Sequence, residues 1–266
     1  MTTQYETLRP EDTYREAFGV EPPEAPIERM LWPRKPGGFI VHRPVANALR
    51  TPAAAGPPTA AVAPAAPQAP AADAPAPEAT APTPPADRTR VLVPAQWGLV
   101  PHWVKSASDA KLRAPKLTTA KSDLLGTGTA FREAWLAGQR CIVPMQAFYA
   151  DDHRKGKPVP TRIARIDGKP MGLAGLWARW QGADGEEIIS YALITVNANN
   201  HALLNRYQPP GSEKSMPVIL NEGAYDAWLT ARTDKAKEFL RQYPAQSLLA
   251  NPVEKKADKA PKGWLD

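Results

Sequence analysis

The stretch that decides the fold is residues 162–196, RIARIDGKPMGLAGLWARWQGADGEEIISYALITV. It holds three apolar runs, at 162–166, 171–180 and 188–196, separated by Asp167-Gly168 and Asp184-Gly185. Asp-Gly between apolar runs is typical of hairpin turns, because glycine readily adopts the positive φ that these turns need. We therefore predict three strands in succession, with a hairpin between the first two.

Shorter elements are predicted on both sides of this stretch. Strands are expected at 39–41, 90–97, 140–143, 147–149 and 216–220, and helices at 10–18, 130–137, 222–229 and 234–243. Strands outnumber helices and do not alternate with them regularly. This pattern favours an α+β fold with a largely antiparallel sheet over a parallel α/β fold.

A single domain is expected over residues 1–250, interrupted by one insertion. Residues 51–87 are almost entirely Ala and Pro, a composition that offers too little apolar surface to build a core. We interpret them as a disordered or partly polyproline linker between two strands. A PxxP site for a protein partner is the alternative. Residues 251–266 contain four lysines and two prolines and are expected to form a loose tail.

Composition sets broad limits on function. The net charge of +6 permits weak attraction to phosphate but equally suits a solubilising surface. The single cysteine, Cys141, lies in an apolar run, so we expect it to be buried. The four histidines are scattered, and no metal site or cofactor is predicted. Without a secretory signal or a run of about 18 apolar residues, we expect a cytoplasmic monomer with no membrane partner.

Short phrases in a fixed order connect the chain to a known family. They are WGLVPHW (97–103), FR (131–132), RCIVP (140–144), FY (148–149), AGLWARW (174–180), TVNAN (195–199) and MPVIL (216–220). Together they resemble the SOS-response-associated peptidase (SRAP) family, the abasic-site processing proteins. The resemblance is good over residues 89–230 and weak over residues 1–45. It implies an open, mixed, largely antiparallel β-barrel-like sheet with peripheral helices and a positively charged groove.

The resemblance also implies a reaction. The family exposes a cysteine at the N-terminus, whose amine and thiol capture the aldehyde of an abasic site in single-stranded DNA. A ring closed by sulfur then resists hydrolysis. A glutamate and a histidine move protons, and an asparagine positions the N-terminus.

At the four matching positions this chain has Thr2, Thr119, Ala150 and Gln208. The amine of Thr2 can still form an imine once Met1 is removed, but its hydroxyl closes a weaker ring. Thr119 lacks the amide of asparagine, Ala150 has no ionisable group, and Gln208 cannot carry protons near neutral pH. We interpret the chain as a divergent member that binds single-stranded or abasic-site DNA with impaired covalent chemistry. The alternatives are an active protein that uses the Thr2 amine, or a non-catalytic protein-interaction module.

The sequence offers further candidate residues besides these four. Asp152 would share a face with Ala150 if the strand reached it, although a solvated acidic turn is the favoured interpretation. His201 is expected on a helix surface. Tryptophans can stack on unpaired bases and basic side chains can follow phosphates, although ordinary surface charge remains the alternative for each basic residue. The DNA-binding candidates are Trp97, Trp103, Lys121, Arg132, Arg140, Arg206 and Lys214.

Overall fold

The computed structural model describes residues 4–9, 11–50, 87–154 and 156–253. Three predicted features lie outside these residues: Thr2, the linker except for its last residue Asp87, and the tail beyond Val253. Strand β13 (Leu248–Pro252) pairs with β8 (Val159–Arg165). Residues 251–252 therefore belong to a sheet and not to a tail.

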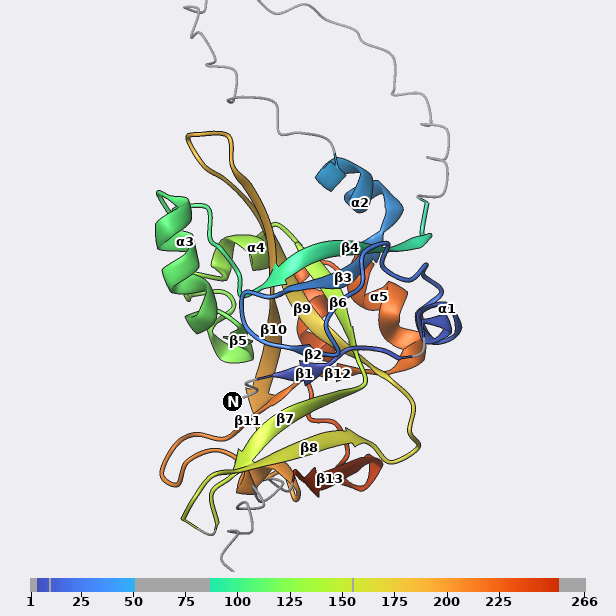
Figure 1. Cartoon of the computed structure of the whole chain (residues 1–266), viewed down its shortest axis with the longest axis vertical. Helices are drawn as coiled ribbons and strands as arrows, with labels where there is room; N and C mark the ends of the chain where they lie inside the picture. The colour runs from blue at the N-terminus through green and yellow to red at the C-terminus, as the bar shows by residue number, and fades with distance from the viewer. Residues whose placement is uncertain (1–3, 10, 51–86, 155, 254–266) are drawn as a thin grey trace, which may run out of the picture.

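Five strands close into a barrel (Figure 1). They are β3 (Pro36–His42), β4 (Arg90–Trp97), β6 (Arg140–Met145), β9 (Met171–Gln181) and β10 (Glu187–Asn197). The order is β10-β4-β3-β6-β9, and β9 pairs back with β10. Only the β4–β10 pair is parallel. The predicted α+β fold with a mixed, largely antiparallel barrel is confirmed, and the ring is closed rather than open.

Three short strands extend the barrel at one end. Strand β5 (Thr119–Lys121) runs parallel to β10, and β11 (Ser215–Pro217) runs antiparallel to it. Lys121 and Pro217 both lie opposite Thr195, so β5 and β11 flank the same part of β10. Strand β12 (Ile219–Leu220) pairs with β9.

A second sheet lies below the barrel in Figure 1, in the order β13-β8-β7-β1-β2. Its remaining strands are β7 (Ala147–Asp152), β1 (Tyr5–Glu6) and β2 (Met30–Leu31). The predicted hairpin between 162–166 and 171–180 is wrong, because β8 pairs with β7 and β13 whereas β9 lies in the barrel. Pro170 precedes β9 and has no N–H to extend a ladder. By contrast, Asp184-Gly185 does connect a hairpin, β9–β10.

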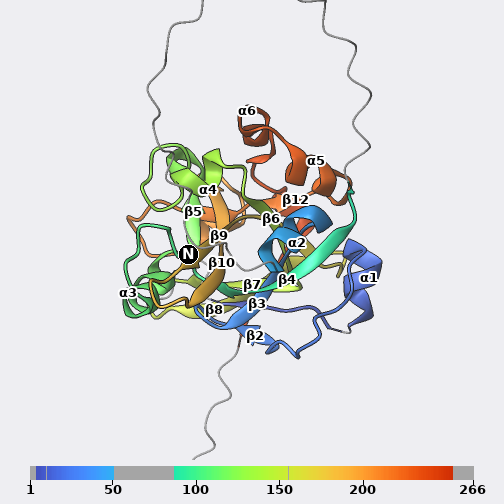
Figure 2. The ribbon, with the colours of Figure 1, turned by 90° about the horizontal axis from the view of Figure 1, so that it is seen from above.

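Helices cover the outside of the barrel (Figure 2). The α-helices are α1 (Asp12–Phe18), α2 (Arg43–Arg50), α3 (Ala107–Arg113), α4 (Arg132–Leu136), α5 (Tyr225–Thr230) and α6 (Thr233–Ala236). Short 3₁₀ turns are η1 (Ala114–Lys116), η2 (Ser122–Leu124), η3 (Leu204–Arg206), η4 (Glu222–Ala224), η5 (Lys237–Phe239) and η6 (Ala245–Ser247). The four predicted helices are present but shorter than expected. Helices α2 and α3 were not predicted, although Ser106 caps α3 by accepting the Asp109 N–H at 3.2 Å. No helix in the described part of the chain has the length and apolar character needed to cross a membrane.

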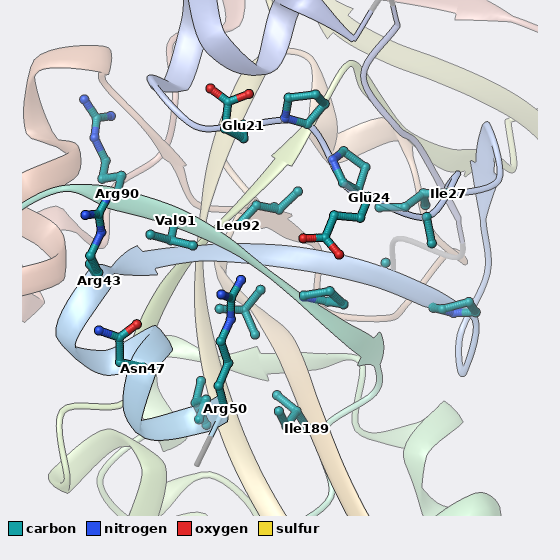
Figure 3. A pocket seen from close by; sticks show the side chains of 18 of the residues that line it. Glu21, Glu24, Ile27, Arg43, Asn47, Arg50, Arg90, Val91, Leu92 and Ile189 are labelled. Atoms are coloured by element: carbon teal, nitrogen blue, oxygen red, sulfur yellow. The ribbon is translucent and has the colours of Figure 1, made fainter.

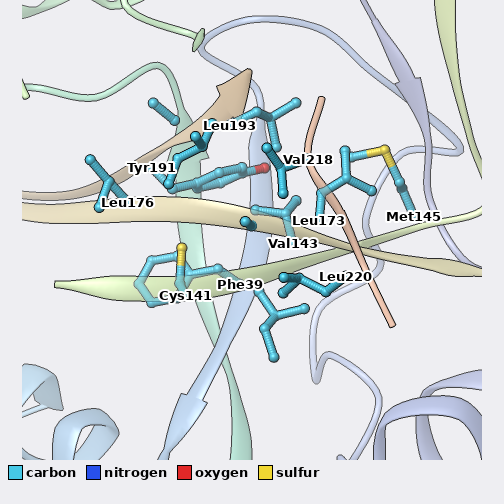
Figure 4. Packing of buried hydrophobic residues seen from close by; sticks show 14 of the residues in the cluster. Phe39, Cys141, Val143, Met145, Leu173, Leu176, Tyr191, Leu193, Val218 and Leu220 are labelled. Carbon is cyan, nitrogen blue, oxygen red and sulfur yellow. The ribbon is translucent and has the colours of Figure 1, made fainter. Parts of the chain in front are cut away.

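The barrel interior is filled by apolar side chains from all its strands (Figure 4). Phe39, Leu173, Tyr191 and Leu193 are fully buried there. Cys141 is also fully buried, and this burial raises the pKa of its thiol well above the ordinary value. The expectation that Cys141 is buried is therefore confirmed.

Candidate functional site

The described chain begins beside β7. The Tyr149 N–H donates to the Gln4 carbonyl at 3.0 Å, immediately before β1 starts. Tyr5 then points inward, where its hydroxyl lies 2.5 Å from that of Tyr191 and its ring meets the ring of Trp97 edge-on at 5.2 Å. These contacts fix where the N-terminal strand enters the fold.

Two of the substituted positions, Ala150 and Gln208, lie next to this entry point. Ala150 follows Tyr149 in β7 and is buried. The Gln208 N–H donates to the Asp151 carbonyl at 3.0 Å, so Gln208 is bonded to the residue after Ala150. The Gln208 side-chain amide donates to the Ser215 carbonyl at 2.7 Å. Gln208 therefore holds β11 in place and has a structural function in this protein.

The third described position, Thr119, is connected to β1 through Trp97. Thr119 is buried at the start of β5. The Trp97 indole N–H donates to the carbonyl of the preceding residue, Thr118, at 3.1 Å, while its ring packs against Tyr5. Ala150 and Gln208 therefore lie beside the start of β1, whereas Thr119 is connected to it only through Thr118 and the ring of Trp97. Thr2 itself lies outside the described residues.

Asp152 and His201, the two ionisable candidates close in sequence to Ala150 and Gln208, already have other partners. Strand β7 includes Asp152, so Asp152 shares a face with Ala150 and is not part of a solvated turn. A hydrogen bond from Arg154 lowers the pKa of the Asp152 carboxyl, which overcomes the opposing effect of burial. The two side chains are 2.6 Å apart. Asp152 therefore stays ionised at neutral pH and cannot donate a proton there.

His201 is buried, and the expectation of a helix-surface histidine is wrong. Its Nδ1 accepts the backbone N–H groups of Leu203 and Leu204 at 3.2 and 3.0 Å. Its Nε2 lies 2.7 Å from the Tyr243 carbonyl, to which it donates. Because both ring nitrogens have backbone partners, His201 fixes a loop and has no ring nitrogen free for proton transfer.

Two of the DNA-binding candidates are buried, so these two assignments do not fit the structure. Trp97 is 0% exposed, and Arg140 is 6% exposed. The Arg140 guanidinium donates to the carbonyls of Trp228 and Ala231, at the C-terminal end of α5. Both residues therefore support the fold and have no free surface for a nucleic acid.

The remaining candidates are at least partly accessible. Trp103 is 37% exposed, with its indole N–H bonded to the Thr129 carbonyl at 3.3 Å. Arg132 begins α4, whereas Arg206 ends η3, two residues before Gln208. The Lys214 ammonium donates to the Gln208 carbonyl at 3.1 Å, and Lys121 pairs with Glu213. Lys121, Arg206 and Lys214 therefore lie close to the substituted site.

Trp32 and Arg34 are further surface candidates that sequence reasoning missed. Trp32 is 49% exposed in the turn between β2 and β3. In this turn the Arg34 N–H donates to the Trp97 carbonyl at 2.7 Å, and Arg34 has a φ of 70°. The sequence WPRK (32–35) shows an aromatic and a basic residue two positions apart, but only the fold brings Arg34 to Trp97.

A charged cluster anchors β1 from the other face of the sheet. Glu6 is 6% exposed. Its carboxylate accepts from Arg29 at 2.8 Å and from Arg162 at 2.7 Å. Burial alone would raise the pKa of Glu6, but the two arginines outweigh it and hold the pKa below its ordinary value. Since β1 has only two residues, this cluster is a main anchor of the strand.

We expect Glu6→Gln to lower the free energy of unfolding by about 2 kcal/mol at pH 7, because two arginines lose their charged partner. The pKa of Glu6 is lower in the folded protein than in the unfolded chain. The ionised carboxylate therefore stabilises the fold at pH values above the unfolded pKa, and this stabilisation is lost on acidification. The difference from wild type should therefore shrink below about pH 4. Urea unfolding between pH 3 and pH 7 measures this difference in the free energy of unfolding. Glu16→Gln, on the exposed face of α1, is the control. A difference that does not change with pH would contradict the ion-pair assignment.

A large cavity lies elsewhere on the molecule (Figure 3). It has a volume of about 1040 Å³ and is lined by residues of β4, the segment 19–27 and helix α2. None of the three described substituted positions lines it. No group of three His, Cys, Asp or Glu side chains suited to a metal ion occurs in the described ranges. The site around β1 is therefore defined by its contacts and not by this cavity.

Comparison with known proteins identifies the family. The model of the SOS response associated peptidase (SRAP) family matches residues 42–260. The chain belongs to the SRAP family. A solved structure of a Bordetella bronchiseptica protein has 31% identity and a TM-score of 0.73, and it covers 95% of this chain and all of its own.

Curated SRAP relatives are named for their action on abasic sites. Abasic site processing protein YoqW of Bacillus subtilis is 28% identical over 162 residues, 59% of this chain and 67% of YoqW. Abasic site processing protein HMCES of Gallus gallus is 27% identical over 187 residues, 62% of this chain and 53% of HMCES. The chain thus spans about half of HMCES.

Proposed function

We propose that this SRAP-family protein binds single-stranded or abasic-site DNA around the start of β1, and that its covalent chemistry is impaired. One observation supports this most. Ala150 and Gln208 lie beside the N-terminal strand, and Thr119 is connected to it through Trp97, yet none of the three can carry a proton at neutral pH. Asp152 and His201 are the candidate replacements that the sequence offers, and both are bonded to other partners. Binding to DNA does not require the lost groups.

The surface near the site has the features that single-stranded DNA requires. Lys121, Arg206 and Lys214 lie near Gln208, and cationic side chains attract the phosphate backbone. Trp32 and Trp103 are the accessible tryptophans among the described residues. Unpaired bases stack on such rings regardless of sequence. A cytoplasmic location and a role in the DNA-damage response are parts of the same proposal.

The second candidate is an active abasic-site processing protein. Once Met1 is removed, the Thr2 amine can attack the C1′ aldehyde and lose water to form an imine. The Thr2 hydroxyl can then add to the imine carbon, which closes an oxazolidine. Oxygen makes a weaker trap than sulfur, and no proton carrier assists the steps at the three described positions.

Two measurements separate these candidates from a protein-interaction module. Titration of a single-stranded oligonucleotide over a range of salt should give an affinity that falls as salt rises. Incubation with an abasic oligonucleotide and borohydride should trap little adduct, unlike a parallel sample of B. subtilis YoqW as positive control. An abundant adduct that disappears after acetylation of the N-terminus would favour the active protein. If no affinity is detected at low salt, the interaction module is the remaining candidate.

A further inference from the structure

Lys121 carries a positive charge two residues after Thr119 in β5, but the ammonium is paired with a carboxylate of the same chain. Its ammonium donates to the Glu213 carboxylate. The same carboxylate accepts from the Asn197 side-chain amide at 2.9 Å. Glu213 is therefore bound by two donors from neighbouring strands, β5 and β10, and both the lysine and the glutamate are partly open to solvent.

The loop that carries Glu213 is held in place without that side chain. The Lys214 N–H donates to the Asn199 side chain at 2.8 Å, and the Lys214 carbonyl accepts the Ala198 N–H at 2.8 Å. The Lys214 ammonium also binds the carbonyls of Gln208 and Pro209. Since these contacts fix the backbone, the Glu213 carboxylate contributes charge to this surface more than it contributes to the fold.

We propose that Lys121 and Asn197 form a subsite for a DNA phosphate, and that the Glu213 carboxylate occupies it in the free protein. A carboxylate and a phosphate both present anionic oxygens, so the ammonium and amide donors suit either one. The subsite lies on β5, beside Thr119, and on the part of β10 that pairs with β11. This inference rests on the proposed DNA binding and adds that DNA must displace an internal competitor.

Such competition changes how binding depends on salt. A phosphate that binds a free lysine releases condensed cations from the DNA, which steepens the dependence on salt. When the phosphate displaces Glu213, the freed carboxylate attracts a cation from solution. This uptake offsets part of the release, so Glu213 both weakens binding and makes it less sensitive to salt.

The test compares wild type with Glu213→Gln in titrations of a single-stranded oligonucleotide from 50 to 300 mM salt. We expect the variant to bind about fivefold more tightly at the lowest salt. Its plot of log affinity against log salt should be steeper by about 0.7, the value for one phosphate on a single strand. Glu238→Gln is the matched control, because the exposed partner of Glu238 is Lys235 and not a residue of the subsite, and its loss changes the net charge equally. Thermal unfolding of each variant verifies that it folds.

A double variant makes the test specific for Lys121. In a Lys121→Met background, Glu213→Gln should change neither the affinity nor the salt dependence by more than the Glu238→Gln control does. If wild type binds DNA but Glu213→Gln matches Glu238→Gln, the competitor role is wrong while the proposed function stands. If Glu213→Gln has its full effect in the Lys121→Met background, the competitor role is also wrong while the proposed function stands. Absence of binding by wild type and every variant would overturn the proposed function together with this inference.

Discussion

Replacing Gly98 by alanine is expected to lower the free energy of unfolding by at least about 3 kcal/mol. Gly98 has a φ of 115°, a conformation that residues with a Cβ rarely adopt. A Cβ there would lie 2.4 Å from the Ala114 carbonyl oxygen and 2.8 Å from its carbon. Because these are backbone atoms, no side-chain rotation can relieve the clash. The Gly98 N–H also donates to the Tyr191 carbonyl at 2.9 Å, which ties the turn to the barrel.

Gly126→Ala is the matched control for this substitution. An added Cβ at Gly126 meets no atom within 4 Å, and its φ is not positive. We expect this variant to be as stable as wild type or up to about 1 kcal/mol more stable, since alanine restricts the unfolded chain. Urea unfolding of both variants measures the difference. Equal stabilities would mean that the chain at Gly98 does not approach Ala114 as closely as the structure indicates.

Arg140→Met should lower the free energy of unfolding by about 3 kcal/mol. The guanidinium is buried, and it satisfies the carbonyls of Trp228 and Ala231 where α5 ends. Each buried carbonyl left without a donor costs about 1–3 kcal/mol. Burial lowers the pKa of the guanidinium, and the Arg140 Nη1 has no hydrogen-bond partner among the described residues. The substitution also removes a buried charge that is only partly compensated, which is favourable. The expected decrease in the free energy of unfolding is therefore smaller than the cost of the unpaired carbonyls alone.

Arg132→Met at the exposed start of α4 provides the comparison. A surface substitution of this kind should change stability by no more than about 0.5 kcal/mol. Thermal unfolding and DNA titration of the two variants separate a structural residue from a DNA-contacting residue. If Arg140→Met keeps wild-type stability but weakens DNA binding, the sequence-based assignment of Arg140 to the DNA surface is correct and our structural assignment is wrong.

The fold was predictable where local sequence determines pairing. Asp184-Gly185 connects two long apolar runs, and β9 and β10 pair across it. Asp167-Gly168 has the same composition but no hairpin, because the following Pro170 interrupts the ladder and the chain changes sheets. A turn motif predicts that the chain reverses direction. Which strand then pairs with the strand after the turn depends on residues far away in the sequence.

Only part of the candidate site could be predicted from the sequence. The family phrases indicated Thr119, Ala150 and Gln208; in the structure Ala150 and Gln208 lie beside β1, and Thr119 is connected to it through Trp97. The function of Arg140 could not be predicted, since the same guanidinium can bind phosphate or backbone carbonyls. The contact between Lys121 and Glu213 joins residues 92 positions apart. Such a pair depends on how the loop that carries Glu213 packs against β5, which a single sequence does not reveal.

The central claim is that the site binds DNA but has lost the groups that complete the covalent reaction. Its most direct test incubates wild type, without reductant, with an abasic single-stranded oligonucleotide and measures the heat-stable crosslink by denaturing electrophoresis. We predict reversible, salt-dependent binding and no heat-stable product, since the absent proton carriers account for about a 10²–10⁴-fold difference in rate. Rapid formation of a stoichiometric, heat-stable crosslink through the N-terminal residue would contradict the claim.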